Sequence, residues 1–317
     1  MHEPCTASYA PYMRYSVQAA AIATGVSESR LRTWERRYGV PLPARSESGR
    51  RLYEEADLAV VRRMAALVGA GIPASEAARG ALTERAIEQL APAGVAADPR
   101  VAELVEAARA LDAAHIATLL AAASTVQRGG GGGWGVAVDA LVTPALARMR
   151  EEWADGRLAL AGERLTLEAA HVALAVAFAR ADEPPPHARL VLLASPQDEH
   201  HELPLRALSL LLRERALRVV SLGADLPAAE LASATALLAP AAVCIVGTGV
   251  TSGGALAQAA RAVVGCGLPL QLFIGGAVVA SGHMPDSAPG VRLAGSVVAM
   301  ADAIAQVLAV PARRRRR

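Results

Sequence analysis

The 317-residue sequence has few aromatic residues, few cysteines and no long apolar run. Aromatic residues make up 3% of the chain, so Ala, Leu and Val must fill the cores of a sequence that is 53% hydrophobic. Because Ala and Leu are strong helix formers, this composition favours helices. No stretch of about 18 uninterrupted apolar residues occurs, which argues against a membrane-spanning helix. The N-terminal Met1-His2-Glu3-Pro4 lacks the charged-then-apolar pattern of a signal peptide.

The three cysteines, Cys5, Cys244 and Cys266, are scattered and show no Cys-x-x-Cys spacing. An odd, scattered set argues against a disulfide scaffold and against a zinc site. Without a leader or a disulfide framework, we expect a cytoplasmic protein.

The formal net charge is only +2, but the charge is unevenly distributed. Between Arg14 and Tyr53 there are eight arginines and three acidic residues. Such a local excess is typical of an element that binds nucleic acid. The tail at 312–317 carries five consecutive arginines after a proline, and we expect a solvated end with at most weak, non-specific DNA contact.

The pattern of charge and hydrophobicity divides the chain into three segments. The first (14–85) is basic, the second (98–182) is rich in Ala and Leu with helical spacing, and the third (188–311) alternates apolar runs with helices. The boundary at 183–186 is a Glu-Pro-Pro-Pro stretch, which predicts a stiff linker. The five glycines at 129–133 predict a flexible loop between helices. A phosphate-binding loop is disfavoured, because no Lys-Ser/Thr pair follows them and no strand precedes them.

The last segment predicts a parallel α/β unit. Short buried strands are expected at 190–194, 219–223, 242–247 and 270–276, with helices at 205–215 and 228–238. Apolar runs of this length that alternate with helices indicate a sheet covered on both faces. Ligands of such sheets bind outside the carboxyl ends of the strands.

The basic segment predicts two short helices and a hairpin. A helix at 17–23 is followed by a turn at Gly25, and Ser27 is a good N-cap for a second helix that runs to about Tyr38. On that second helix Leu31, Trp34 and Tyr38 share the inward face. Arg32, Thr33, Arg36 and Arg37 share the outward face, where they suit a major groove. Residues 45–53 predict a hairpin wing that Leu52 and Tyr53 anchor on the core.

Several stretches of this segment together resemble the MerR-family DNA-binding domain: Tyr15-Ser16-Val17, Thr24-Gly25-Val26-Ser27, Leu31-Arg32, Trp34-Glu35-Arg36-Arg37-Tyr38-Gly39, Pro43, Arg45 and Gly49-Arg50-Arg51-Leu52-Tyr53. The resemblance implies a winged helix-turn-helix that binds double-stranded DNA. By it, DNA is contacted by Ser16, Arg30, Arg32, Thr33, Arg36, Arg37, Arg45, Arg50, Arg51 and Tyr53. MerR-type domains act as dimers on two-fold sites, so we expect a palindromic operator and a homodimer or higher homo-oligomer.

A second motif, Glu199-His200-His201-Glu202, comes directly after the first expected strand. By itself, a histidine at this place could be a metal ligand, a general base or a surface residue. In the middle segment, a helix at 141–153 ends near Gly156 and is followed by Glu163.

Together these features resemble the cobalamin-binding module of methionine synthase and of CarH/LitR-type photoreceptor regulators. The resemblance implies a four-helix bundle above a Rossmann-like, flavodoxin-like α/β domain, with cobalamin between them. It makes His201 the lower cobalt ligand, with Glu199 holding the other ring N–H. Trp153 and Glu163 then belong to the upper face. The cofactor-binding set that it implies is Trp153, Glu163, Glu199, His201, Glu202, Leu203, Gly247, Thr248, Gly249, Gly275 and Gly276.

The chain departs from this family pattern at four of the matched positions. Pro204 stands in place of a glycine, Arg164 in place of a histidine, Gly247 in place of a serine, and Ala154 where some light sensors have a histidine. Two readings therefore remain open for the C-terminal half. It is either a cobalamin sensor, with adenosylcobalamin and light as the family precedent, or a degenerate sensor that binds another small molecule or only mediates oligomerisation. A cobalamin-dependent isomerase or methyl-transfer subunit is a third reading, and the fused DNA-binding segment argues against an enzyme.

Overall fold

The computed structural model describes residues 14–41, 43–46, 49–69, 71–75, 77–78, 81, 98–125, 133–248, 252–280, 285 and 288–309. The chain divides into two compact units, residues 1–81 and residues 82–317. The basic tail, most of the five-glycine run and Gly249 lie outside the described residues.

The first unit contains helices α1 (Val17–Thr24), α2 (Glu28–Tyr38) and α3 (Glu55–Gly69). The expected N-cap of α2 is present, and the structure adds a C-cap at Gly39. The hydroxyl of Ser27 accepts a hydrogen bond from the backbone N–H of Arg30, and Gly39 ends the helix in the left-handed conformation (φ 67°). The turn between α1 and α2 uses Gly25 at φ 68°. Leu31 and Trp34 are buried as expected, whereas Tyr38 is only half-buried.

The expected wing is a short antiparallel hairpin of β1 (Ala44–Arg45) and β2 (Arg51–Leu52). A further bridge joins Tyr53 to Tyr15, with backbone N–H···O distances of 2.7 and 2.9 Å in the two directions. The chain before α1 is thereby paired with the chain after the wing, which fixes the hairpin on the helices.

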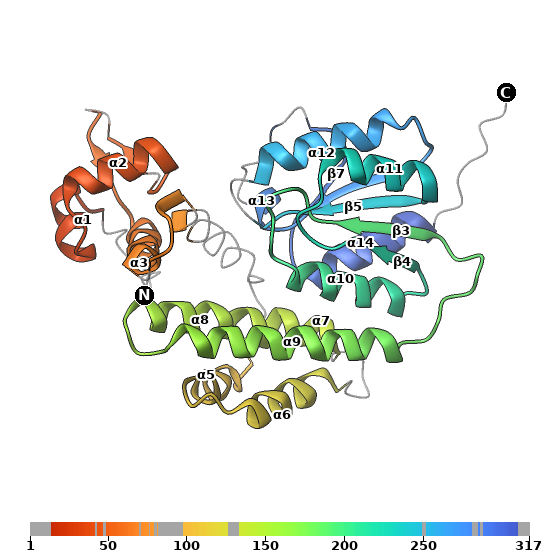
Figure 1. The fold of residues 1–317 in the computed structure, drawn as a ribbon, viewed down its shortest axis with the longest axis horizontal. Coiled ribbons are helices and arrows are strands. Elements are labelled where there is room, and N and C mark those ends of the chain that lie inside the picture. The colour runs from red at the N-terminus through yellow and green to blue at the C-terminus, as the bar shows by residue number, and fades with distance from the viewer. Residues whose placement is uncertain are drawn as a thin grey trace, which may run out of the picture. The chain divides into compact units, whose positions relative to one another are not determined.

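The second unit begins with four antiparallel helical rods, formed by α5 (Val101–Arg109), α6 (Ala113–Ser124), a composite rod and α9 (Leu160–Arg180). The composite rod runs through α7 (Trp134–Ala137), the π-helical turn η1 (Val138–Val142) and α8 (Thr143–Ala154). These rods form the expected four-helix bundle, seen in the lower half of Figure 1.

The π-helical turn has a local cause in Pro144. Proline has no N–H to donate to the carbonyl four residues before it, so the carbonyl of Ala140 is released from the helix. The N–H of Thr143 bonds instead to the carbonyl of Val138, which widens the turn. The freed carbonyl of Ala140 accepts the N–H of Asp98 at 3.1 Å. This bond ties the start of the bundle to its third rod.

The rest of the unit is a parallel sheet of β3 (Leu190–Ala194), β4 (Arg218–Ser221), β5 (Ala242–Val246), β6 (Gln271–Gly275) and β7 (Val291–Leu293). The strand order is β4-β3-β5-β6-β7, with every neighbouring pair parallel. Strand β7 was not expected from the sequence, because its three residues give no recognisable apolar run. In this flavodoxin-like order the topology switches between β3 and β5, and ligands of such sheets bind beside that point, at the carboxyl ends of the strands.

Helices cover both faces of the sheet (Figure 1). One face packs on α10 (Leu203–Glu214) and α14 (Val297–Ala309), and the other on α11 (Ala228–Leu238) and α12 (Gly253–Gly265). A short helix, α13 (Ala277–Ala280), follows β6. The fold class expected from the sequence is thus the one that the structure has.

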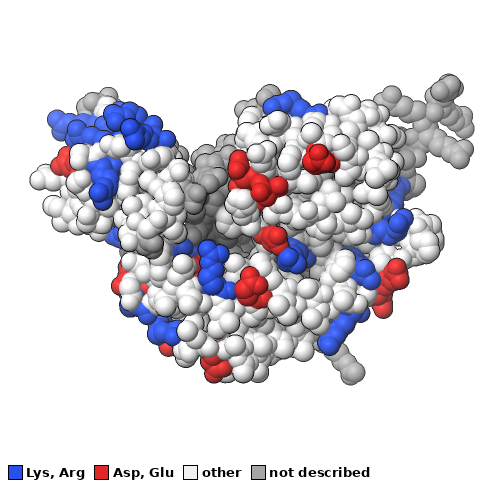
Figure 2. Space-filling view, in the orientation of Figure 1, with Lys and Arg blue, Asp and Glu red and all other residues white. Residues whose placement is uncertain are grey.

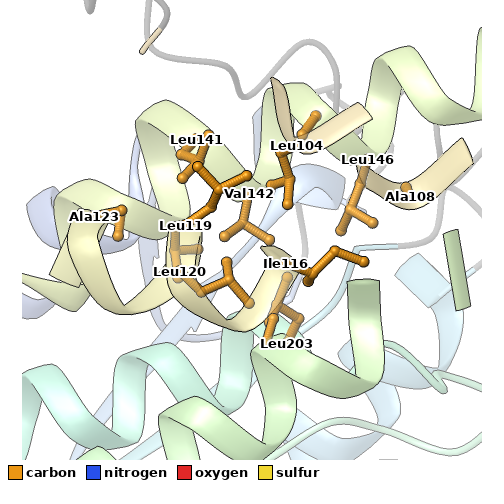
Figure 3. Packing of buried hydrophobic residues seen from close by; sticks show 14 of the residues in the cluster. Leu104, Ala108, Ile116, Leu119, Leu120, Ala123, Leu141, Val142, Leu146 and Leu203 are labelled. Atoms are coloured by element: carbon orange, nitrogen blue, oxygen red, sulfur yellow. The ribbon is translucent and has the colours of Figure 1, made fainter. Parts of the chain in front are cut away.

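The bundle rests directly on the α/β layers. Leu203, Ala207 and Leu210 of α10 belong to the same apolar core as the bundle, and Leu203 lies among the bundle residues in Figure 3. The carboxylate of Asp139, in the π-helical turn, accepts the backbone N–H of Val297 at 3.3 Å, at the start of α14. The bundle and the sheet therefore belong to one packed unit.

Candidate functional site

The arginines of the first unit make one exposed basic surface, which we call the α2 face. Figure 2 shows blue side chains gathered over the part of the molecule where Figure 1 labels α2. Its exposed members are Arg30, Arg32, Arg36 and Arg37 of α2, with Arg45 and Arg50 of the wing. Arg30 lies over the Trp34 ring, 6.0 Å from its centroid, and Arg32 pairs with Glu28 at 3.1 Å. This surface has the charge that phosphate binding requires.

Glu35 joins the wing to α2. Its carboxylate lies 2.6 Å from Nε of Arg51 and 3.6 Å from a guanidinium nitrogen of Arg45. The bond to Glu35 raises the pKa of Arg51 above its usual value, so this guanidinium stays charged. Arg51 is half-buried and committed to this pair, which gives it a positioning role for the hairpin in addition to the expected DNA contact.

Three of the expected DNA-contacting side chains already have local roles. Tyr53 is 0% exposed, so the expectation that its side chain contacts DNA is wrong, whereas its expected anchoring role is consistent with this burial. Ser16 is exposed and caps α1 by accepting the N–H of Ala19. The hydroxyl of Thr33 donates to the carbonyl of Ser29, one turn earlier.

The carboxyl edge of the sheet holds one fully buried acid, Glu199, which is 1% exposed. Oε2 of Glu199 accepts the backbone N–H of Thr248 at 2.7 Å and the hydroxyl of Ser252 at 2.9 Å. Oε1 accepts the hydroxyl of Thr248 at 2.9 Å. A buried carboxylate needs such donors, and here they come from the loop after β5, across the topological switch point from β3.

His201 completes this arrangement. Its Nδ1 lies 2.6 Å from Oε1 of Glu199, and its backbone N–H donates to the same oxygen at 3.1 Å. Because a carboxylate only accepts, Nδ1 carries the proton and Nε2 keeps its lone pair in the neutral ring. The imidazole side chain as a whole is 37% exposed, so the ring is not enclosed in the core. The sequence placed Glu199 and His201 together, and the structure does so as well.

The loop that carries this pair is fixed by the turn after β4. The N–H of Asp225 donates to the carbonyl of Glu199 at 2.9 Å, and Oδ1 of Asp225 accepts the N–H of Asp198 at 2.8 Å. A bridge between Pro196 and Leu226 adds a third connection. The imidazole is therefore presented by a loop with defined backbone bonds on both sides.

The other residues expected beside His201 lie at the start of α10. Glu202 pairs with Arg206 one turn later, at 2.5 Å, and Leu203 is buried in the core that α10 shares with the bundle. Pro204 occupies the first turn of α10, where a missing N–H costs nothing. Thr248, in the loop after β5, donates hydrogen bonds to Glu199. Glu202, Leu203 and Thr248 thus each have a partner within the fold.

The small residues expected in the cofactor-binding set, Gly247, Gly275 and Gly276, lie in close contact with neighbouring side chains or backbone. A Cβ on Gly247 would lie 2.3 Å from Cδ1 of Leu256, and one on Gly275 would lie 2.2 Å from Cε of Met300. Gly276 adopts φ 98°, and a Cβ there would meet the carbonyl of Gly247 at 2.3 Å. Gly276 is therefore required by the backbone itself, whereas a side chain at Gly247 or Gly275 would have to displace the end of a flexible neighbouring side chain.

In the bundle, Glu163 lies against Arg150 rather than standing open. Nε of Arg150 is 2.7 Å from Oε1 of Glu163, and both side chains are 9% exposed. Trp153 is partly buried and packs against the bundle core.

Sequence reasoning missed Ser252, which donates to Glu199 from 53 positions away. A signal was present, because Ser252 lies a few residues past an expected strand, at the edge where ligands of parallel sheets bind. The described residues contain no group of three or more His, Cys, Asp or Glu side chains arranged to hold a metal ion. Within the same residues, no helix combines the length and apolar character needed to cross a membrane.

Comparison with known proteins identifies the family. Residues 15–81 match the family model of MerR HTH family regulatory proteins. The HTH-type transcriptional repressor CarH of Myxococcus xanthus is 31% identical over 238 residues, which cover 71% of this chain and 76% of CarH. The repressor CarA of the same organism is 32% identical over 240 residues, covering 72% and 74%.

Among solved structures, the monomethylamine corrinoid protein of Methanosarcina barkeri aligns with a TM-score of 0.49 and 15% identity, over 65% of this chain and 96% of that protein. Both repressors are more than 30% identical to this chain over more than two thirds of its length. The chain belongs to the MerR family of helix-turn-helix regulators, in the group that contains CarH and CarA.

Proposed function

We propose that this protein is a transcription regulator whose DNA binding is controlled by a corrinoid, with cobalamin as the expected form. The α2 face contacts a palindromic operator, and a homodimer or higher homo-oligomer places two such faces on the two halves of the site. His201 would hold the cobalt through Nε2.

The observation that carries the proposal is the Glu199–His201 hydrogen bond of 2.6 Å. It fixes the tautomer that leaves Nε2 free to donate an electron pair, and a neutral imidazole nitrogen is a good ligand for a transition metal. A corrin would bring its cobalt already bound, so one protein nitrogen would be enough to hold it. The donor chemistry of this edge therefore fits the group.

The residues expected on the upper face of the cobalamin, Trp153 and Glu163, give weaker support to the proposal of a corrinoid site. Trp153 is within the bundle as expected, but Glu163 is committed to Arg150. Leu256 and Met300 also fill the space beside Gly247 and Gly275. These contacts favour the second candidate, in which the C-terminal half has lost cobalamin and serves assembly or another small molecule.

One experiment separates the two candidates. The protein is mixed with adenosylcobalamin or hydroxocobalamin in the dark and passed through a gel-filtration column. We expect colour to travel with the protein, and we expect His201→Ala to change the absorption spectrum of the bound corrinoid. His200→Ala is the matched control, because His200 is the exposed neighbour of His201. A colourless protein peak, or an identical spectrum for His201→Ala, would refute the ligand assignment.

Two further measurements address control of DNA binding. Binding to duplex DNA is compared with and without the corrinoid, since control requires different affinities for the two protein states. Illumination of the loaded protein followed by sizing then tests whether its assembly responds to light. Equal DNA affinity with and without ligand would separate corrinoid binding from regulation.

A further inference from the structure

We propose that Glu35 strengthens DNA binding although it is an acid beside the basic α2 face. Its carboxylate holds both strands of the wing against α2, so that the wing arginines reach phosphates of the same duplex. Glu35 is therefore a positioning residue and does not itself contact DNA. This inference rests on the proposed function, in which the α2 face contacts an operator.

The wing is too short to hold its own orientation. Its strands pair through two residues each, Ala44 with Leu52 and Arg45 with Arg51. An isolated two-stranded hairpin is at best marginally stable in water. The bridge that Tyr53 makes fixes the base of the wing to the chain before α1, not to α2. The direction of the wing relative to α2 therefore needs a further contact.

Glu35 supplies that contact to both strands at once. Its Oε2 lies 2.6 Å from Nε of Arg51 in β2, and its Oε1 lies 3.6 Å from a guanidinium nitrogen of Arg45 in β1. The Glu35 side chain is 17% exposed, so salt weakens these pairs less than it weakens a fully exposed pair. Arg45 also donates to the carbonyl of Gly49 at 3.4 Å, which connects the pair to the end of the wing.

The position of Glu35 gives rise to two opposite expectations for DNA binding. A carboxylate close to the arginines of the α2 face repels phosphate, so its charge alone lowers the affinity for DNA. A carboxylate that holds the wing in place raises the affinity, because each wing arginine that reaches a phosphate releases counterions. The direction in which affinity changes when Glu35 is replaced therefore distinguishes the two roles.

Glu28 offers a matched control on the same helix. Its carboxylate pairs with Arg32 one turn later, at 3.1 Å, and both side chains are exposed. Glu28→Gln thus removes the same charge from α2 without loosening the wing, and we expect about twofold tighter DNA binding. Glu35→Gln should instead bind DNA about three- to tenfold more weakly, the range for one hydrogen-bonded contact.

The test uses the full-length protein and a fluorescently labelled duplex of mixed sequence, because phosphate contacts do not depend on the bases. Anisotropy titrations at several salt concentrations give the affinity and the slope of log K against log salt. Glu35→Gln should lower this slope by about one to two, as Arg45 and Arg50 lose their phosphates. Trypsin should also cut after Arg50 faster in Glu35→Gln than in the wild type or in Glu28→Gln.

Arg51→Lys perturbs the same pair from the wing. Lysine keeps the positive charge but lacks the Nε donor that lies 2.6 Å from Glu35. This variant should therefore also bind DNA more weakly and with a lower salt slope, although its net charge is that of the wild type. Because Arg51→Lys leaves α2 intact, it decides the question if Glu35→Gln does not fold.

The outcomes are separable. If the wild type does not bind the duplex, DNA binding by the α2 face fails and this inference fails with it. If the wild type binds and Glu35→Gln binds equally well or more tightly, only the inference is overturned. Weaker binding by Glu35→Gln with the wild-type salt slope and the wild-type rate of cleavage after Arg50 would also overturn it, because the wing would then be in place.

Discussion

Nδ1 of His201 lies 2.6 Å from a Glu199 carboxylate that two residues of a distant loop, Thr248 and Ser252, hold in place. The carboxylate is almost completely buried, while the imidazole that it orients is partly exposed. This arrangement suits a histidine that binds a metal, because the carboxylate that orients the ring is fixed while the ring itself is partly exposed.

Glu199→Gln should weaken corrinoid binding by about 10- to 100-fold, the range for partners that orient a ligating histidine. A neutral amide makes the imidazole less basic and no longer fixes its tautomer. The measurement is an absorbance titration with hydroxocobalamin. Glu230→Gln, an exposed change in the first turn of α11, should leave the affinity unchanged. Unchanged affinity for Glu199→Gln would show that the pair serves only the fold.

Arg36→Ala and Arg37→Ala should each weaken DNA binding and reduce its salt dependence. Each lost phosphate contact lowers the slope of log K against log salt by about one. Fluorescence anisotropy with a labelled duplex at several salt concentrations measures this slope. Arg261→Ala, at an exposed position of α12 in the second unit, is the control and should keep the wild-type slope. The α2 face would lose its assignment if all three variants behaved alike.

Tyr53→Phe should leave DNA affinity unchanged and should not lower the free energy of unfolding. The Tyr53 hydroxyl is buried and has no hydrogen-bond partner among the described residues, so its removal relieves an unsatisfied group. Burial also raises the pKa of the tyrosine. Tyr53→Ala, in contrast, should destabilise the first unit by about 3–5 kcal/mol through the cavity it leaves. Weaker DNA binding by a stable Tyr53→Phe protein would reinstate Tyr53 as a contact.

Glu163→Ala should lower the free energy of unfolding of the second unit by about 3–5 kcal/mol, because it leaves Arg150 charged and buried without its carboxylate. Replacing both residues by apolar ones, Arg150→Met with Glu163→Leu, should recover most of the loss. Denaturant unfolding followed by circular dichroism measures both. Glu168→Ala, an exposed change on the same helix, is the control. Full stability of Glu163→Ala would indicate that the pair is not structural.

Stability should fall as the pH falls from 7 to 5, in part because of His171. Burial lowers the pKa of His171 below 6.5, with Arg206 acting in the same direction against Glu168 and Glu202. In this window the unfolded chain binds a proton that the folded chain resists, so the unfolded state gains protons and stability decreases. His171→Gln should flatten the dependence in thermal unfolding. His187→Gln, in an exposed loop, should retain the wild-type slope, and a His171→Gln slope as steep as that would contradict the prediction.

The local sequence pattern was enough to predict the type of many elements and the contacts between residues that are close in sequence. The N-cap at Ser27, the turn at Gly25 and the strand at 190–194 are encoded by residues within a few positions of each other. Glu199 and His201 are two residues apart, so their meeting also needed no tertiary information. The same holds for the outward arginines of α2, which follow from helical periodicity.

Period, capping and spacing act within a single turn or strand, so they were enough to predict many of the main elements, the basic face of α2 and the acid–histidine pair, but not strand β7. Tertiary packing, in contrast, commits Glu163 to Arg150 and brings Ser252 to Glu199 across 53 positions. It also decided that Met300 fills the space beside Gly275. These contacts depend on which distant elements pack together, and packing is set by the shapes of whole faces rather than by any local run of residues.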